Sequence, residues 1–225
     1  YIVANVQRQK QACSYTVETS PNIAQIESID CGKIFQQAVD NVDNFITTHR
    51  YFAGLAQNLD PRTVLAVAGH EAAVVRHPWG PCGFIIPWNF PMLMTAWKWG
   101  PALAAGCTIV MKPAEQTPLT CLRMAKLAQE AGFPDGVINV IPGYGPTAGG
   151  AMVKHPLIDK IAFTGEHTTA QIIQREAAET MKRLTFELGG KSPNIVFADA
   201  DLDAAVAGSD AGLFFNMGQC CCAGS

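Results

Sequence analysis

From Cys82 onward, short apolar runs alternate with helical segments, and this alternation constrains the fold more than any other feature of the chain. The predicted strands span residues 83–86, 108–111, 137–141, 160–163 and 184–186. The predicted helices between them span residues 91–106, 118–132 and 147–153. Strands that alternate with helices form a parallel sheet with helices on both faces. The sequence therefore predicts an α/β fold.

Two kinds of element precede this alternation. Apolar residues three and four positions apart predict helices over residues 23–29, 35–46 and 51–59. Residues 63–67 and 72–76 flank Gly69 and predict a β-hairpin with the glycine at its turn. An isolated hairpin is only marginally stable, so we expect this one to pack on another surface, such as a second subunit.

Composition limits the class of ligand. The 225 residues include 16 Lys and Arg against 19 Asp and Glu, without a basic block that would indicate a nucleic-acid or acidic-membrane partner. The most apolar stretches, 82–87 and 91–111, are interrupted by Pro, Gly and Lys98, so neither is expected to span a bilayer. A small molecule is therefore the expected ligand. An opening Tyr1 in place of Met predicts a trimmed or incomplete chain.

Eight cysteines are present, and most lie singly in apolar contexts. This distribution favours reduced thiols in an intracellular protein over a disulfide framework. Three cysteines are adjacent, at positions 220–222. Adjacent cysteines lack the two-residue spacer that lets thiolates converge on zinc, so we expect no metal site.

Polar residues and glycines follow four of the predicted strands. They are Trp88-Asn89, Lys112–Glu115, Gly143–Gly145 and Thr164–Glu166. The carboxyl ends of parallel strands meet at one edge of a sheet, and ligands of such sheets bind there. The sequence therefore predicts one ligand crevice built from four strand ends.

Two arrangements of a dinucleotide fit these residues. Residues 143–148 match a G-x-G-x-x-G/A fingerprint, with Glu166 at the distance expected of a ribose-binding acid, although a turn between strand and helix explains the same glycines. In the other arrangement the ammonium of Lys112 and the carboxylate of Glu115 hold the adenosine ribose, and the carboxylate favours NAD over NADP by repelling a 2′-phosphate. A solvated loop pair is the alternative explanation of Lys112 and Glu115. The residues alone leave these possibilities open.

Six motifs stand in an order that resembles the NAD(P)-dependent aldehyde dehydrogenases. They are Ile85–Pro91, Met111–Pro118, Gly143–Gly145, Phe163–Gly165, Glu187–Pro193 and Gly218–Cys221. The likeness runs from about Ile26 to the end of the chain and is strongest to the cytosolic and mitochondrial aldehyde and retinal dehydrogenases. Because members of that family continue well beyond this thiol motif, the chain resembles a partial sequence.

The resemblance implies a domain organisation. A Rossmann-like NAD-binding domain is expected over residues 1–60 and 79–188, with an oligomerisation hairpin over residues 61–78. Residues 189–225 are expected to begin a second α/β domain, the catalytic one. The resemblance also implies a homodimer or homotetramer, located in the cytoplasm or alternatively in the mitochondrial matrix.

The resemblance further implies residue roles in oxidising an aldehyde to a carboxylic acid with NAD as cofactor. Cys221 is the expected nucleophile, Asn89 with the backbone N–H of Cys221 is expected to bind the oxyanion, and Glu187 is expected to activate the water that hydrolyses a thioester. Trp97 and Lys98 are expected as support and pocket walls. The expected cofactor-binding residues are Ile86, Trp88, Lys112, Glu115, Gly145, Gly165 and Glu166.

Two residues depart from the family pattern. Many relatives carry a small hydroxyl residue where this chain has Glu166, and a glycine where it has Ala170. A carboxylate about 4 Å from a phosphate costs roughly 4 kcal/mol before relaxation at an effective dielectric constant near 20. The alternative function is therefore a non-catalytic structural or binding relative, of the kind that lens crystallins illustrate. A thiol hydrolase is a poorer alternative because no His base can be identified.

Overall fold

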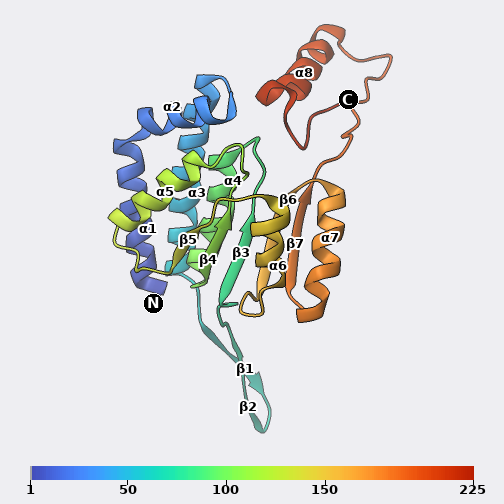
Figure 1. The fold of residues 1–225 in the computed structure, drawn as a ribbon. Coiled ribbons are helices and arrows are strands. Elements are labelled where there is room, and N and C mark those ends of the chain that lie inside the picture. Colours follow the sequence, from blue (N-terminus) through green and yellow to red (C-terminus); the bar gives the residue numbers. More distant parts are fainter. Residues whose placement is uncertain (1) are drawn as a thin grey trace.

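The computed structural model describes residues 2–225 and confirms the α/β prediction (Figure 1). Tyr1, the first residue of the predicted cofactor domain, lies outside the described residues. One five-stranded parallel sheet has the order β5-β4-β3-β6-β7. Its strands are β3 (Pro81–Ile85), β4 (Thr108–Lys112), β5 (Ile138–Val140), β6 (Lys160–Gly165) and β7 (Arg183–Leu188).

Helices cover both faces of this sheet, as predicted. One face packs on α1 (Ile2–Glu18), α2 (Ser20–Cys31), α3 (Phe35–Gln57), α4 (Pro91–Ala104) and α5 (Leu119–Glu130). The other face packs on α6 (Gly150–Lys154) and α7 (His167–Ala177). Alternate residues of β3 serve the two layers, since Phe84 lies in the first core and Ile85 in the second.

Gly83 shows how closely the second layer packs. A Cβ atom at this position would lie 2.6 Å from Cδ1 of Ile161 and 2.7 Å from Sδ of Met152. A methyl group here would displace the ends of these two side chains, so a glycine allows their close packing between β3 and α6.

The N-terminal helices are longer than the sequence predicts. The two helices expected over residues 35–46 and 51–59 form one continuous helix, α3, so their separation was wrong. α1 lies in a segment for which the sequence predicted no element. α2 contains the predicted helix over 23–29 and ends at Gly32, whose φ of 71° gives the left-handed conformation typical of a helix C-terminus.

The start of α5 also differs from the prediction. The sequence predicts a helix from residue 118, but α5 begins at Leu119. Thr117 has a residue type common at N-caps, yet its buried hydroxyl makes no hydrogen bond within residues 2–225. The carboxylate of Asp30 instead accepts the Leu119 backbone N–H at 2.8 Å. A residue on α2 therefore supplies the cap that the local sequence appeared to contain. Leu119 and Leu122 are exposed on this helix.

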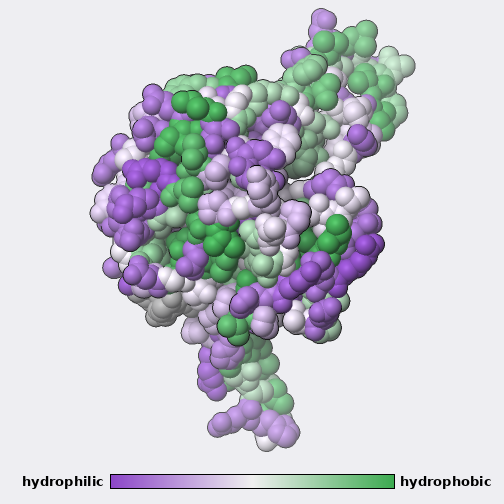
Figure 2. Space-filling view, viewed as in Figure 1, coloured by the Kyte–Doolittle hydropathy of each residue, from purple (hydrophilic) through white to green (hydrophobic). Residues whose placement is uncertain are grey.

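The predicted hairpin is confirmed and stands apart from the body of the molecule (Figure 1). β1 (Arg62–Val67) pairs antiparallel with β2 (His70–Val75), and Gly69 has a φ of 75° at the turn. Apolar side chains are exposed along both strands, and Figure 2 shows them as a hydrophobic zone on the projecting arm. These exposed residues are Val64, Leu65, Val67, Val74 and Val75.

α8 (Leu202–Phe214) and the loops beside it project from the end of the molecule opposite the hairpin (Figure 1). This segment carries exposed apolar residues too, including Phe197, Leu202 and Val206 (Figure 2). Among residues 2–225, every helix is too short or too polar to cross a membrane.

Candidate active site

A pocket of about 470 Å³ lies at the carboxyl ends of β3, β4 and β6. The four groups of residues that follow predicted strands all contribute to its lining, as expected of a parallel sheet. The pocket brings together all seven cofactor-binding candidates, which are Ile86, Trp88, Lys112, Glu115, Gly145, Gly165 and Glu166.

Lys112 is the buried cation of this pocket. Only 2% of the residue is exposed, because it ends the inner strand β4. Its Nζ donates to the carbonyl of Pro113 at 2.9 Å and to Oε2 of Glu115 at 3.1 Å. The pair is therefore not the solvated loop pair that the sequence left open, since a buried ammonium is held by neighbours that fix its direction.

Glu115 is more exposed than Lys112 and stays ionised. Its own backbone N–H, with further help from Lys112, holds the pKa of this carboxyl below the usual value. The pair thus offers a fixed donor and a charged acceptor next to each other, which suits two adjacent hydroxyl groups of a ribose.

The glycine fingerprint, residues 143–148, does not have the position in the sheet that a dinucleotide-binding motif would have. Residues 145–149 form a π-helical turn followed by the short α6, and Gly143 lies in the loop after edge strand β5. Glu166 follows β6, and β4 and β3 separate β6 from β5 in the sheet. In a dinucleotide motif the glycine turn and the ribose acid follow neighbouring strands, so this topology favours Lys112 and Glu115 as the ribose site.

Glu166 is the N-cap of α7. Its Oε2 accepts hydrogen bonds from the backbone N–H groups of Thr168 at 2.7 Å and Thr169 at 3.1 Å, and from the hydroxyl of Thr168. These bonds, led by that from the Thr168 hydroxyl, lower the pKa of the Glu166 carboxyl. The carboxylate therefore occupies the positive end of a helix that faces the pocket, where an anionic ligand group would otherwise bind.

The three adjacent thiols lie in a turn after α8, with Cys221 exposed. Their sulfur atoms lie within 4.8 Å of one another, and those of Cys220 and Cys222 are 3.3 Å apart. The expectation that adjacent cysteines cannot converge was therefore wrong, because the turn folds the chain back on itself. Burial raises the pKa of Cys220 to about 11, so this neighbour stays a neutral thiol.

Asn89 lies next to the thiol turn although 130 residues separate it from Gln219. Its Nδ2 donates to the carbonyl of Gln219 at 2.9 Å, which leaves the second hydrogen of the amide group for another acceptor. Within residues 2–225 the backbone N–H of Cys221 donates to no acceptor. Two N–H groups, one on each side of this junction, are thus without an acceptor within residues 2–225.

Glu187 belongs to β7, opposite Thr164 of β6, and its side chain is exposed. Within the described part of the chain its carboxylate makes no hydrogen bond, so it is free to bind water. Burial lowers the pKa of Lys98, and the charge of Glu187 partly opposes this shift. The supporting residue Lys98 thus lies within electrostatic reach of the proposed base.

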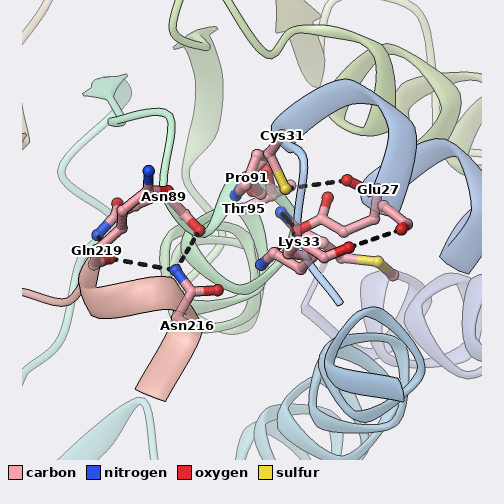
Figure 3. A network of polar contacts seen from close by, with 10 residues as sticks. Glu27, Cys31, Lys33, Asn89, Pro91, Thr95, Asn216 and Gln219 are labelled. Carbon is pink, nitrogen blue, oxygen red and sulfur yellow. Dashed lines mark hydrogen bonds and ion pairs between the residues drawn. The ribbon is translucent and has the colours of Figure 1, made fainter. Parts of the chain in front are cut away.

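Sequence reasoning missed two buried polar residues, one that contacts the Asn89 loop and one that contacts the start of α4. Asn216 is fully buried and hydrogen-bonds to the carbonyls of Asn89 and Gln219 (Figure 3). Glu27 is buried in an ion pair with Lys33 and also accepts the backbone N–H of Met92 at 3.3 Å, near the start of α4. Neither role could be read locally, because one partner of each residue is distant: Asn89 lies 127 residues from Asn216, and Met92 lies 65 residues from Glu27.

Comparison with known proteins assigns the fold and the motifs to a family. The model of the aldehyde dehydrogenase family matches residues 8–225. The chain belongs to this family. The match begins well before Ile26, so it includes much of α1, where the sequence showed no recognisable motif.

Several relatives of this aldehyde dehydrogenase chain have curated names. It is 56% identical to human "Retinal dehydrogenase 2" over 207 residues, which is 90% of this chain and 40% of the relative. It is 53% identical to pig "Aldehyde dehydrogenase, mitochondrial", again over 90% of this chain but 39% of the relative. The chain therefore spans about two fifths of the length of these relatives.

Solved structures agree with the fold. The NAD+ complex of an aldehyde dehydrogenase from Bacillus cereus superposes with a TM-score of 0.95 at 44% identity, covering 99% of this chain and 46% of the other. A betaine aldehyde dehydrogenase from Staphylococcus aureus in complex with NAD+ has the same TM-score at 37% identity, covering 99% of this chain and 44% of the other. The arrangement of sheet, hairpin and thiol turn is thus shared across these aldehyde dehydrogenases.

Proposed function

We propose that the protein containing this chain oxidises an aldehyde to a carboxylic acid with NAD, using Cys221 as nucleophile. The observation that carries this proposal is the junction of Asn89 and the thiol turn, held by the bond from Asn89 Nδ2 to the Gln219 carbonyl at 2.9 Å. This bond supports the proposal because it joins Asn89, which follows the pocket residue Trp88, to the turn that carries the exposed thiol of Cys221.

The first step is addition of the Cys221 thiolate to the aldehyde carbon. The new C–S bond converts the carbonyl oxygen into an oxyanion. The amide of Asn89 and the backbone N–H of Cys221 stabilise this charge, and loss of one such donor typically costs on the order of 10²–10³ in rate. Collapse of the adduct to a thioester requires that the aldehyde hydrogen leaves with its electron pair.

NAD fits the pocket at the strand ends. Lys112 is buried and oriented, Glu115 is ionised, and together they suit the hydroxyls of an adenosine ribose. The charge of Glu115 also opposes a 2′-phosphate, which supports NAD over NADP. When bound, the nicotinamide supplies the acceptor for the departing hydride. Ile86, Trp88, Gly145 and Gly165 contribute walls to this pocket.

Glu187 completes the reaction by removing a proton from water. The water oxygen attacks the thioester carbon, and the C–S bond breaks to return the Cys221 thiolate and release the acid. An exposed carboxylate at the end of β7, followed by Gly189 and Gly190, has the freedom to reach such a water. The overall balance is one aldehyde, one NAD+ and one water to one acid, one NADH and one proton.

The hairpin supports a homo-oligomer. The apolar side chains on its two strands are exposed in this chain. A second copy could cover them by pairing with a strand edge or by packing on the apolar side chains. The domain boundaries at residues 61, 79 and 189 stay predictions. A cytoplasmic location, with the mitochondrial matrix as alternative, stays a prediction.

The test uses the full-length protein. Purified enzyme with NAD+ and a panel of aldehydes is followed at 340 nm for NADH. We expect aldehyde-dependent NADH from the wild type, none from Cys221→Ala, and activity retained in the matched control Cys222→Ala. NAD binding without turnover on any aldehyde would contradict the proposal.

A further inference from the structure

Asn216 is a fully buried polar residue between the two loops that carry the proposed oxyanion donor and nucleophile. Its exposed fraction is 0%. Its Nδ2 lies 3.1 Å from the carbonyl oxygen of Asn89 and 3.1 Å from the carbonyl oxygen of Gln219 (Figure 3). The amide group of Asn216 thus donates hydrogen bonds to two backbone carbonyls, one 127 residues away in sequence and the other 3 residues away.

Other contacts join the same two loops. The Asn89 side chain donates back to the Gln219 carbonyl at 2.9 Å, so that oxygen receives two hydrogen bonds. The ring of Phe215 stacks on that of Phe90 with centroids 6.0 Å apart. Asn216 lies at the centre of this junction, because both of its bonds go to main-chain atoms of the loops.

The hydrogen-bond acceptors and the backbone conformation at position 216 both favour Asn. Two carbonyl oxygens only accept hydrogen bonds, so a donor with two hydrogens is needed between them. The backbone adds a second requirement, since Asn216 has a φ of 50° and the next residue, Met217, has a φ of 59°. Asn tolerates this left-handed conformation better than other non-glycine residues. Asp would fit the backbone but would turn an oxygen and a charge toward the two carbonyls.

We propose that Asn216 is a positioning residue that fixes the Cys221 turn against the Asn89 loop, an inference that rests on the function proposed above. It contacts neither pocket nor thiol by a hydrogen bond, and its effect passes through the backbone of Asn89 and Gln219. Misplacement of reacting groups by about 1 Å can cost on the order of 10² in rate. The proposal therefore predicts a large effect on kcat from a residue outside the reacting groups.

A double-mutant cycle in the full-length enzyme tests this. Asn216→Gly keeps the left-handed backbone and removes both bonds, and we expect kcat to fall by roughly 10²-fold while KM for NAD stays unchanged. If Asn216 acts by placing Asn89, the same substitution in an Asn89→Ala background should lower kcat by less than about threefold. Independent, multiplicative losses would overturn the proposal. Asn216→Asp gives a second variant, in which we expect an equal or larger loss.

Hydrogen exchange supplies a measurement that does not depend on turnover. We expect Asn216→Gly to speed amide exchange in residues 217–222 and in 87–90 together, because the junction holds both loops. The matched control is Asn139→Asp, whose Nδ2 also bridges two carbonyls, of Ile109 and Gly136, beside the edge strand β5. This control should leave both loops and kcat unchanged.

The outcomes separate the two proposals. Unchanged exchange in both loops would overturn the role of Asn216 even in an active enzyme. Coupled loosening of both loops in a protein that produces no NADH would support the junction and reject the proposed function. Coupled loosening together with the non-additive loss of kcat would support both.

Discussion

The carboxylate of Glu166 accepts the backbone N–H of Thr168 at 2.7 Å and so caps α7 from inside the pocket. This contact shows what the carboxylate at position 166 does in the structure, where many relatives carry a small hydroxyl residue. The protein's own anion occupies the helix terminus that would attract the diphosphate of a dinucleotide, and its charge would repel that group.

Replacing Glu166 with Ser should therefore tighten NAD binding. The substitution removes the charge and leaves a short hydroxyl that still caps the helix. We expect the dissociation constant to fall by roughly tenfold, measured by calorimetric titration, because the substitution removes the like-charge repulsion of the diphosphate. Glu115→Ser is the matched comparison and should weaken binding. Weaker binding in Glu166→Ser would show that Glu166 holds the cofactor.

Glu187→Gln should separate the two halves of the reaction. The thiol step and hydride loss do not need this carboxylate, whereas hydrolysis of the thioester does. We expect a burst of about one NADH per active site followed by turnover slowed on the order of 10²–10⁴-fold, recorded by stopped-flow absorbance at 340 nm. Mass spectrometry should find the acyl group on Cys221. Glu176→Gln, on α7, should show steady turnover without a burst.

His49 should make the fold sensitive to acid. Burial lowers its pKa from 6.5 to about 4, while its Nδ1 lies 3.0 Å from the Phe45 carbonyl. The unfolded chain takes up a proton near pH 6.5 and the folded chain does not, so stability is complete above pH 6.5 and is lost as pH falls toward 4. The loss should reach about 3 kcal/mol.

Urea unfolding between pH 7 and 4 measures this loss. His49→Gln, which keeps a donor for the Phe45 carbonyl, should show a shallower decline of the unfolding free energy than the wild type. His70→Gln changes an exposed histidine at the hairpin turn and should retain the wild-type decline. If the unfolding free energy declined equally with falling pH in all three proteins, the acid sensitivity would not come from His49.

Breaking the buried ion pair of Lys33 and Glu27 should lower the free energy of unfolding far more than breaking an exposed ion pair. Both side chains are fully buried, with Lys33 Nζ 3.2 Å from Glu27 Oε1 and 4.7 Å from the centroid of the Phe90 ring. Lys33→Met should lower the unfolding free energy by roughly 3–5 kcal/mol, because it leaves a buried carboxylate without its cation.

Two further variants separate the pair from its surroundings. Adding Glu27→Gln to Lys33→Met should recover part of the loss, since the unpaired charge disappears. Lys154→Met breaks the exposed pair with Glu176 and should cost less than about 1 kcal/mol. Thermal melts of the four proteins make the comparison, and a loss in Lys33→Met as small as that in Lys154→Met would reject the prediction.

Val64→Lys should reduce the oligomeric mass of the full-length protein. Val64 is 67% exposed on β1, and a charge there would disfavour burial against a second copy. Light scattering coupled to size exclusion measures the mass. Thr63→Lys, whose side chain points to the opposite face of the same strand, should have the smaller effect. An unchanged mass in both variants would place the interface elsewhere.

The parts of this site that the sequence predicts are those that follow from strand periodicity. Lys112, Gly145 and Gly165 lie in one pocket because parallel strands end at a common edge, and that geometry requires no knowledge of distant contacts. Local signals failed where a partner from elsewhere in the chain was decisive. Thr117 has the residue type of a cap, yet Asp30 reaches α5 across 89 residues and replaces it.

Two other features of the site were not predicted from the sequence: the burial of Lys112 and the convergence of the three thiols. Nothing near Lys112 in the sequence indicates that its ammonium is buried, because the covering atoms come from the loops of other strands. The three thiols converge in a turn that follows three residues with positive φ, Asn216, Met217 and Gly218. Asn and Gly are residue types that favour such a conformation, but Met is not, so the sequence gives only part of the signal.

The hairpin and the pocket attach to opposite ends of the same strand. β3 begins at Pro81, a few residues after the hairpin, and runs only to Ile85 before the chain reaches the pocket wall at Ile86. Five residues of strand, roughly 16 Å, therefore lie between the base of the hairpin and the wall of the pocket. Because β3 is buried at the centre of the sheet, we expect it to act as a rigid spacer, so that substitutions in the hairpin leave the shape of the pocket unchanged.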